Sequence, residues 1–128
     1  MNPTDLRYHQ EHEWIRVQGN RAVLGISDFA QDALGDIVFL EMPKTGAMVK
    51  AGQEIGEVES TKTTSTIYTP VTGKIVETNA ELSKHPELVN SDPYGKGWIA
   101  VIELTNPAEV TTLMTAAQYE QFLAKQKP

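Results

Sequence analysis

Apolar residues in this chain gather in short runs separated by turn-forming residues, a pattern that predicts a mainly β fold. The runs at 14–17 and 21–26 flank Gln18-Gly19-Asn20, so we expect a hairpin with these three residues at its turn. Residues 37–42 are almost continuously apolar, which predicts a strand buried on both faces. The last strand is expected at 98–104.

Short helices are expected where capping residues precede apolar positions. Ser27 or Asp28 would begin a helix that runs to about Leu34, and Gly35 would stop it. Asn79 would cap one or two further turns. The body of the fold is therefore expected to consist of strands with a few short helices between them.

The C-terminal end carries the clearest helix signals. Asn106 as the cap and Glu109 at the third position predict one short helix. Thr115 followed by Gln118 resembles a second cap, so two short helices are expected there. The polar tail from Ala124 is expected to fray. The side chains that would pack the second helix onto the body are Tyr119, Phe122 and Leu123.

The stretch 52–76 is predicted to form two strands folded back on one another, with Lys62 at or beside the bend. Residues 60–66 contain no apolar side chain, so this segment is expected to be a solvated tip. Its other residues carry hydroxyls, which leaves Lys62 as the single cation, well placed for contact by other proteins. The apolar positions of the two strands are Ile55, Val58, Ile67, Val71, Ile75 and Val76.

The composition narrows the class of protein. A chain of 128 residues is long enough for one domain with a real core. The net charge of -6 argues against nucleic acid and anionic membrane surfaces as partners. There is no cysteine, so neither a disulfide nor a thiol nucleophile is available. Without a signal-peptide pattern or an apolar run of membrane-spanning length, we expect a cytoplasmic protein; a processed organellar form would show the same features.

No enzyme is visible in the pattern of reactive residues. His9, His12 and His85 are spread along the chain without a cysteine partner. Glu11 and Glu13 flank His12, but alternation on a strand would send the histidine to the opposite face, so no metal site is expected. The serines form no plausible triad, and the glycines form no phosphate-binding loop.

Six motifs follow one another along the chain: Tyr8 with 12–17, then 25–31, 34–40, 58–62, 86–90 and 92–98. Together they resemble the glycine cleavage system H-protein family, a group of lipoyl carriers in the biotinyl/lipoyl-domain-like superfamily. The likeness runs from about residue 8 to residue 123, the core of a single domain spanning 1–128. Biotin carriers are disfavoured because they flank their lysine with methionines, whereas Thr61 and Thr63 stand here.

The resemblance implies a flattened β-barrel or sandwich hybrid of lipoyl-domain type, with two of its few short helices at the C-terminus. It also implies that the amine of Lys62 carries lipoate through an amide bond. Lipoate ligase or octanoyl transferase would recognise the surroundings of the hairpin, namely Glu59, Ser60, Thr61 and Gly73. A glycine within a strand also indicates a bend or the close approach of another backbone, and Gly73 is such a position.

By the same resemblance, the protein is a non-catalytic carrier. It would take the aminomethyl intermediate from glycine decarboxylase to the aminomethyltransferase, and dihydrolipoyl dehydrogenase would then reoxidise it. A monomer that meets each enzyme briefly is expected. Two alternatives stay open: a relay that hands lipoate to dehydrogenase complexes, and an interaction domain with an unmodified hairpin.

The loaded arm is expected to lie in a pocket, because a buried cation needs an acid. On the family's His-Glu-Trp motif, Glu13 is the candidate acid and Trp14 the apolar wall. Thr66 stands where the family has a carboxylate four residues after the lysine, which would weaken the hold on the cation. The alternative is that Glu11 compensates for the missing acid, so that the hold is not weakened.

Overall fold

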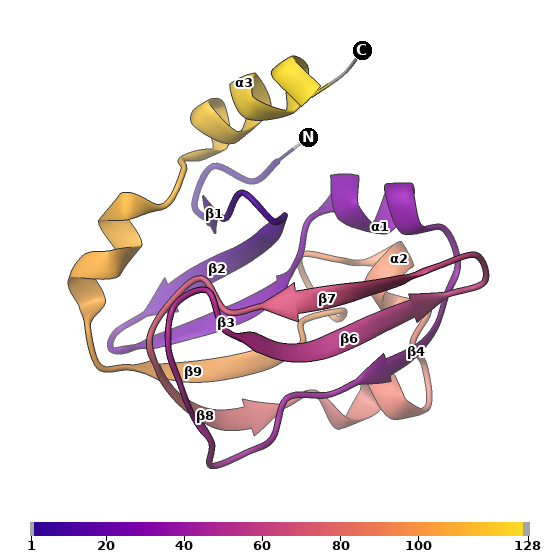
Figure 1. Ribbon diagram of the computed structural model, residues 1–128, viewed down its shortest axis with the longest axis horizontal. Helices are drawn as coiled ribbons and strands as arrows, with labels where there is room; N and C mark the ends of the chain where they lie inside the picture. The colour runs from indigo at the N-terminus through magenta and orange to yellow at the C-terminus, as the bar shows by residue number, and fades with distance from the viewer. Residues whose placement is uncertain (1, 127–128) are drawn as a thin grey trace.

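Two antiparallel sheets form the body of the protein, as the computed structural model shows for residues 2–126 (Figure 1). One sheet has six strands in the order β1-β2-β3-β9-β8-β5, and the other has three in the order β4-β6-β7. This unclosed sandwich with a few short helices confirms the predicted mainly β fold. The strands are β1 (Arg7–Tyr8), β2 (Glu13–Gln18), β3 (Arg21–Ile26), β4 (Ile37–Glu41), β5 (Met48–Val49), β6 (Glu54–Ser60), β7 (Thr64–Tyr68), β8 (Gly73–Thr78) and β9 (Ala100–Leu104).

The first hairpin forms as its sequence predicts. Strands β2 and β3 pair from Glu13 opposite Ile26 to Gln18 opposite Arg21, and Gly19 adopts a φ of 63° in the turn. A positive φ suits glycine because it has no Cβ to clash with the backbone.

The main core lies between the two sheets. Along β9, Ala100, Ile102 and Leu104 are buried while the residues between them are partly exposed, as expected for a strand with one face on the core. From the smaller sheet, Val58 and Ile67 are buried in the same cluster. Burial of these apolar side chains is the main favourable contribution to the free energy of folding.

A second apolar cluster joins the N-terminal segment to the C-terminal helix α3 (Ala116–Gln126). The rings of Tyr8 and Tyr119 stack with centroids 4.6 Å apart. Phe122 and Leu123 pack against the same cluster, which confirms the predicted packing of this helix. The helix continues to Gln126, so the predicted fraying from Ala124 is wrong for residues 124–126. Residues 127–128 lie outside the described part of the chain.

Helix α1 (Asp28–Leu34) is bounded as predicted. The Ser27 hydroxyl accepts a hydrogen bond from the backbone N–H of Ala30, and Gly35 ends the helix with a φ of 85°. Asn79 caps the 3₁₀ turn η1 (Ala80–Ser83), also as predicted. The short helix α2 (Leu88–Ser91) was not foreseen, because its cap residue makes no side-chain capping bond that a sequence could reveal.

Of the two predicted C-terminal helix caps, the one at Thr115 is confirmed and the one at Asn106 is wrong. Thr115 and Gln118 exchange side-chain-to-backbone hydrogen bonds at the start of α3, as the sequence indicates. The 3₁₀ helix η2 (Pro107–Thr112) forms, but the Asn106 side chain makes no capping bond. Both carboxylate oxygens of Glu109 instead accept hydrogen bonds from the backbone N–H and the hydroxyl of Thr72. This glutamate therefore ties η2 to the segment before β8.

Strand β4 contradicts the expectation that residues 37–42 are buried on both faces. Val38 is 49% exposed and Phe39 is 56% exposed. The strand lies at the edge of the smaller sheet, and its pairing with β6 shifts register between Ile37 and Phe39. Such a bulge re-aims side chains, so apolar character alone did not predict their burial. Within residues 2–126, no helix is long and apolar enough to cross a membrane.

Candidate functional site: the Lys62 hairpin

Lys62 lies in the tight turn between β6 and β7, at the end of the hairpin (Figure 1). The backbone N–H of Ser60 donates to the carbonyl of Thr63 at 2.8 Å, which closes the turn. The Ser60 hydroxyl accepts hydrogen bonds from the N–H groups of Lys62 and Thr63 at 3.2 and 3.1 Å. The predicted bend is therefore confirmed, but Ser60 is only 6% exposed and belongs to the support of the tip rather than to its surface.

The tip also rests on the connection between α1 and β4. The N–H of Thr61 donates to the carbonyl of Asp36 at 3.0 Å. The lysine side chain passes over Gly35, where an added Cβ would lie 3.2 Å from the Cε of Lys62. Lys62 is exposed, and the ion pairs found within residues 2–126 do not include it. Its amine is thus presented to solvent beside a backbone held on two sides.

Asn90 clamps this connection, a role that the sequence motif around it does not reveal. Its side-chain oxygen accepts a hydrogen bond from the N–H of Ile37 at 2.9 Å. Its amide nitrogen donates to the carbonyl of Gly35 and to the side chain of Gln31, both at 2.9 Å. These bonds fix the segment to which Thr61 is anchored, so Asn90 positions the lysine tip from the side of α2.

Replacing Asn90 with alanine is expected to lower the free energy of unfolding by about 2 kcal/mol, because a backbone donor and acceptor lose their partner. Asn90→Asp keeps the acceptor for Ile37 but sets a carboxylate oxygen against the carbonyl oxygen of Gly35, so it should not restore the lost stability. Asn106→Ala is the matched control, since that side chain makes no capping bond. Urea unfolding with unchanged m values measures all three. Equal stability of Asn90→Ala and Asn106→Ala would contradict the clamp.

The remaining residues predicted around the hairpin do not all lie together. Glu59 is exposed and pairs across the sheet with Phe39 on one side and Thr64 on the other. Thr66 is half-buried on β7, opposite Glu57. Gly73 lies elsewhere, buried in the six-stranded sheet.

Gly73 confirms the predicted close approach of two backbones. A Cβ at this position would collide with the carbonyl oxygen of Glu103 and would lie 2.8 Å from the Cγ2 of Ile102. The residue pairs with Val49 on one side and Leu104 on the other. Its surroundings therefore support a role in packing, away from the surface that an enzyme would touch.

Glu13 is a buried carboxylate, 1% exposed, at the start of β2. One oxygen lies 2.8 Å from Nδ1 of His9, and the other accepts the N–H of Tyr68 at 3.0 Å. Burial raises the pKa of Glu13, and these two hydrogen bonds partly oppose the rise. Tyr68 ends β7 about 13 Å along the strand from Thr64, beside the tip. Glu13 is thus enclosed in this structure and lies away from the tip, at a distance that a long stem on Lys62 would have to span, and its role as the arm-pocket acid stays a prediction.

Trp14, predicted to give the cleft an apolar wall, lines no surface cleft in this structure. The side chain has no exposed surface and belongs to the cluster shared with Tyr8 and Tyr119. Its indole N–H donates to the carbonyls of Ile26 and Pro93, both at 3.0 Å. The family's His-Glu-Trp motif suggested a wall, but the ring packs beside Tyr94, with centroids 5.9 Å apart, and against the backbone at Gly25.

Glu11 and His12 lie in a turn and not on a strand, so the predicted alternation does not apply. His12 has a φ of 75°, and its Nδ1 lies 2.8 Å from the hydroxyl of Tyr119. Burial lowers the pKa of His12. Glu11 is exposed. No group of three or more metal-binding side chains occurs in the described part of the chain.

The Tyr119 hydroxyl links three elements that the sequence did not connect. It lies 2.8 Å from His12 and 2.7 Å from the Ser27 hydroxyl, which caps α1. Burial raises the pKa of Tyr119 to about 12. The tyrosine therefore stays protonated at neutral pH and joins α3 to the start of α1.

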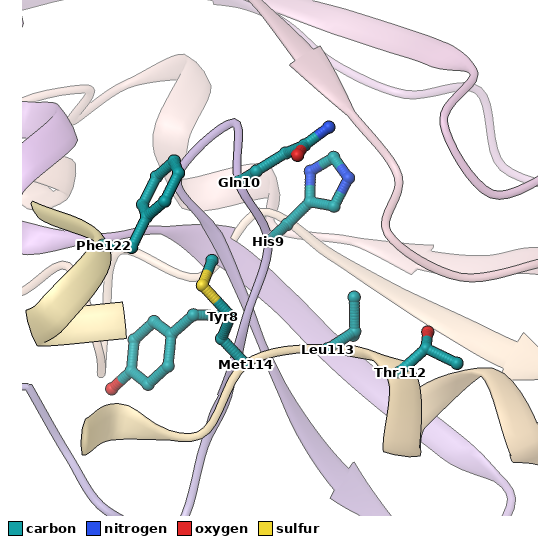
Figure 2. Close-up of a pocket in the computed structure, with 7 residues that line it drawn as sticks. All are labelled: Tyr8, His9, Gln10, Thr112, Leu113, Met114 and Phe122. Carbon is teal, nitrogen blue, oxygen red and sulfur yellow. The ribbon is translucent and has the colours of Figure 1, made fainter. Parts of the chain in front are cut away.

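A shallow hollow lies beside this network (Figure 2). It has a volume of about 290 Å³, and His9, the partner of Glu13, contributes to its lining. None of its lining residues belongs to the β6–β7 hairpin, so it does not form a cleft around Lys62. The other lining residues are Tyr8, Gln10, Thr112, Leu113, Met114 and Phe122.

The stability of the protein should report the burial of Glu13. Its raised pKa means that the folded state binds the proton more tightly than the unfolded state, whose value is near 4.5. Glu13 therefore contributes its full stabilisation below pH 4.5, where it is protonated in both states. This contribution is lost as the pH rises from 4.5 through the raised pKa of the folded state. Glu13→Gln removes this loss and can keep both hydrogen bonds, with its amide nitrogen donating to His9.

We expect the stability of Glu13→Gln relative to the parent to increase between about pH 4 and pH 7. Urea unfolding across this range measures the difference. Glu77→Gln, at an exposed position of β8, is the control and should show little change with pH. A difference for Glu13→Gln that is independent of pH would show that Glu13 titrates alike in the folded and unfolded states.

A body of two antiparallel sheets with a few short helices and an exposed lysine in a hairpin turn is typical of carriers of the lipoyl-domain class. The family model described as "Glycine cleavage H-protein" matches residues 6–126. This chain therefore belongs to the glycine cleavage H-protein family. It is the lipoyl carrier of the glycine cleavage system and a carrier subunit, not an enzyme.

Relatives and solved structures agree with this assignment. The glycine cleavage system H protein of Symbiobacterium thermophilum is 54% identical over 120 residues, which cover 94% of each chain. That of Brevibacillus brevis is 55% identical over 118 residues, which cover 92% of this chain and 94% of the relative. The crystal structure of the Mycobacterium marinum H protein superposes with a TM-score of 0.88 at 39% identity, covering 96% of this chain and 99% of that one.

Proposed function

We propose that Lys62 is the lipoyl attachment site. The observation that carries the proposal is the position of its amine, exposed at a turn whose backbone is fixed by Ser60 and by the carbonyl of Asp36. The residues fit the group, because a long stem attached here extends from the body without displacing a core side chain. When bound, lipoate supplies a dithiolane that accepts and releases the transferred group and exchanges electrons.

Attachment needs little from this chain beyond an accessible amine. The deprotonated Nζ of Lys62 attacks the carbonyl carbon of an activated acyl donor, and an amide bond forms. The activating group leaves with its bonding electron pair, and the nitrogen loses one proton. The product is neutral, so the tip exchanges a compact cation for a long, uncharged stem.

The surroundings also support a set of partners. Membership of the glycine cleavage system supports contact with glycine decarboxylase, the aminomethyltransferase and dihydrolipoyl dehydrogenase, in addition to lipoate ligase or octanoyl transferase. The net charge of -6 favours brief docking on basic surfaces and disfavours self-association. We therefore infer a monomer that visits each enzyme, and the bacterial sources of the relatives support a cytoplasmic site of action.

Intact-mass measurement and peptide mapping test the proposed attachment site. Purified apo protein is incubated with lipoate–protein ligase, lipoate and ATP. We expect the mass to rise by one lipoyl group, and we expect that group on the peptide that contains Lys62. Lipoate mapped to Lys74, or no gain in mass under conditions that modify another H protein, would overturn the proposal.

A further inference from the structure

The outer face of the smaller sheet carries an exposed phenylalanine next to the Lys62 tip. Phe39 lies directly opposite Glu59 on β6, and Glu59 lies opposite Thr64 on β7. Side chains at directly opposite positions share one face of a sheet. In Figure 1 this sheet lies nearest the viewer, and no helix crosses in front of it. The aromatic ring is therefore presented on the same surface as the root of the lysine turn.

Three carboxylates complete this surface, which we call the Phe39 surface (Phe39, Glu41, Glu57 and Glu59). All four side chains are exposed. Glu41 lies directly opposite Glu57 in the next row of the sheet, and like charges at such positions are destabilising. The ion pairs found within residues 2–126 involve none of the three glutamates. Neither the exposed ring of Phe39 nor the facing carboxylates of Glu41 and Glu57 stabilise the folded protein, so their arrangement indicates a binding partner.

The chemistry of the surface indicates what that partner presents. An exposed aromatic side chain among carboxylates is complementary to an apolar pocket rimmed by lysine or arginine. Enzymes that act on a finished arm meet the far end of a long stem and can approach at a distance from the backbone. The attaching enzyme must instead bring its active centre to Nζ itself, so it has to contact the side chains that surround the turn.

We propose that the Phe39 surface is the docking site for the enzyme that acylates Lys62, with Phe39 as the anchor and the three glutamates as the electrostatic guide. This inference rests on the proposed attachment site and adds how the enzyme selects that lysine. Selection needs such a feature, because the tip itself offers only hydroxyl-bearing neighbours. Met48 is also an exposed apolar residue, 62% exposed and opposite Lys74 in the other sheet, and it provides a natural control.

The test is a set of initial-rate measurements with purified lipoate–protein ligase, lipoate and ATP, with the apo protein as the varied substrate. Phe39→Thr, which keeps a residue suited to a strand, should raise KM about tenfold and leave kcat within about twofold, as expected for the loss of one aromatic anchor. Phe39→Tyr should restore the parent KM. Met48→Thr should leave KM unchanged. Circular dichroism and urea unfolding verify that each variant is folded.

The electrostatic part is tested by Glu57→Gln. We expect about a threefold higher KM and a weaker dependence of KM on salt, because one guiding charge is lost. Glu77→Gln on β8 is the matched control and should behave like the parent.

An unchanged KM for Phe39→Thr, or a fall in kcat alone, would overturn the docking proposal. So would a variant that is lipoylated normally but loses affinity only for the glycine cleavage enzymes, since the occupant would then be another protein. Lys62→Arg in the same series separates the two proposals. If it still gains lipoate, the attachment site is wrong; if it does not and Phe39→Thr is normal, only the docking surface is wrong.

Discussion

Replacing Lys62 with arginine is expected to abolish lipoylation and reduce carrier activity to the background measured without any carrier. The guanidinium stays protonated and offers no free electron pair for attack on an acyl carbon. The side chain is exposed and makes no ion pair within the described residues, so the fold should be unaffected, with a stability change within about 0.5 kcal/mol. Intact mass and a reconstituted glycine-cleavage assay measure the two losses.

The comparison with Lys74→Arg makes this result specific. Lys74 is exposed on β8 and has Met48 opposite, but it lies within a strand and not at a turn. We expect this variant to be lipoylated and active like the parent. Retained carrier activity in Lys62→Arg would contradict the swinging-arm function at this position, whatever the mass measurement shows.

Replacing Gly73 with alanine is expected to lower the free energy of unfolding by about 3 kcal/mol, more than any other substitution proposed above, because the added methyl group has no space. The new Cβ would collide with the carbonyl oxygen of Glu103 and approach the carbonyl carbon to 2.9 Å. Both atoms are backbone of β9, which the sheet holds on either side, so relief requires the strand to move. Urea unfolding gives the change in the free energy of unfolding.

Lipoylation of the folded Gly73→Ala protein should proceed with the parent KM, because this glycine is buried away from the tip. That outcome separates a packing role from direct recognition by the modifying enzyme. Gly19→Asn is the control: its φ of 63° is accessible to asparagine, and no atom lies within 4 Å of the added Cβ. If Gly73→Ala is fully folded and its KM for lipoylation is raised, the modifying enzyme would recognise Gly73 after all.

The hairpin tip could be read from the sequence because the information is local. A run without apolar residues between two strands cannot enter a core, so Lys62 had to be exposed. The same holds for the caps at Ser27 and Thr115, where a side chain meets its own backbone a few residues on. Here the covalent spacing of the residues is enough to bring the partners together.

Contacts between distant segments were decided by the tertiary structure. Glu13 is held by the backbone of Tyr68, and the indole of Trp14 is held by Pro93 and Tyr94, about eighty residues further along the chain. Asn90 and Tyr119 carry no pattern that names their partners, although they position the tip and join α3 to α1.

The sequence by itself therefore determined the class of fold and the exposed lysine, through periodicity and turn chemistry. Only the packed sheets decided which acids are buried and that Phe39 is exposed. The physical reason is that burial depends on which surfaces meet, and an edge strand with a bulge leaves apolar side chains without a facing layer.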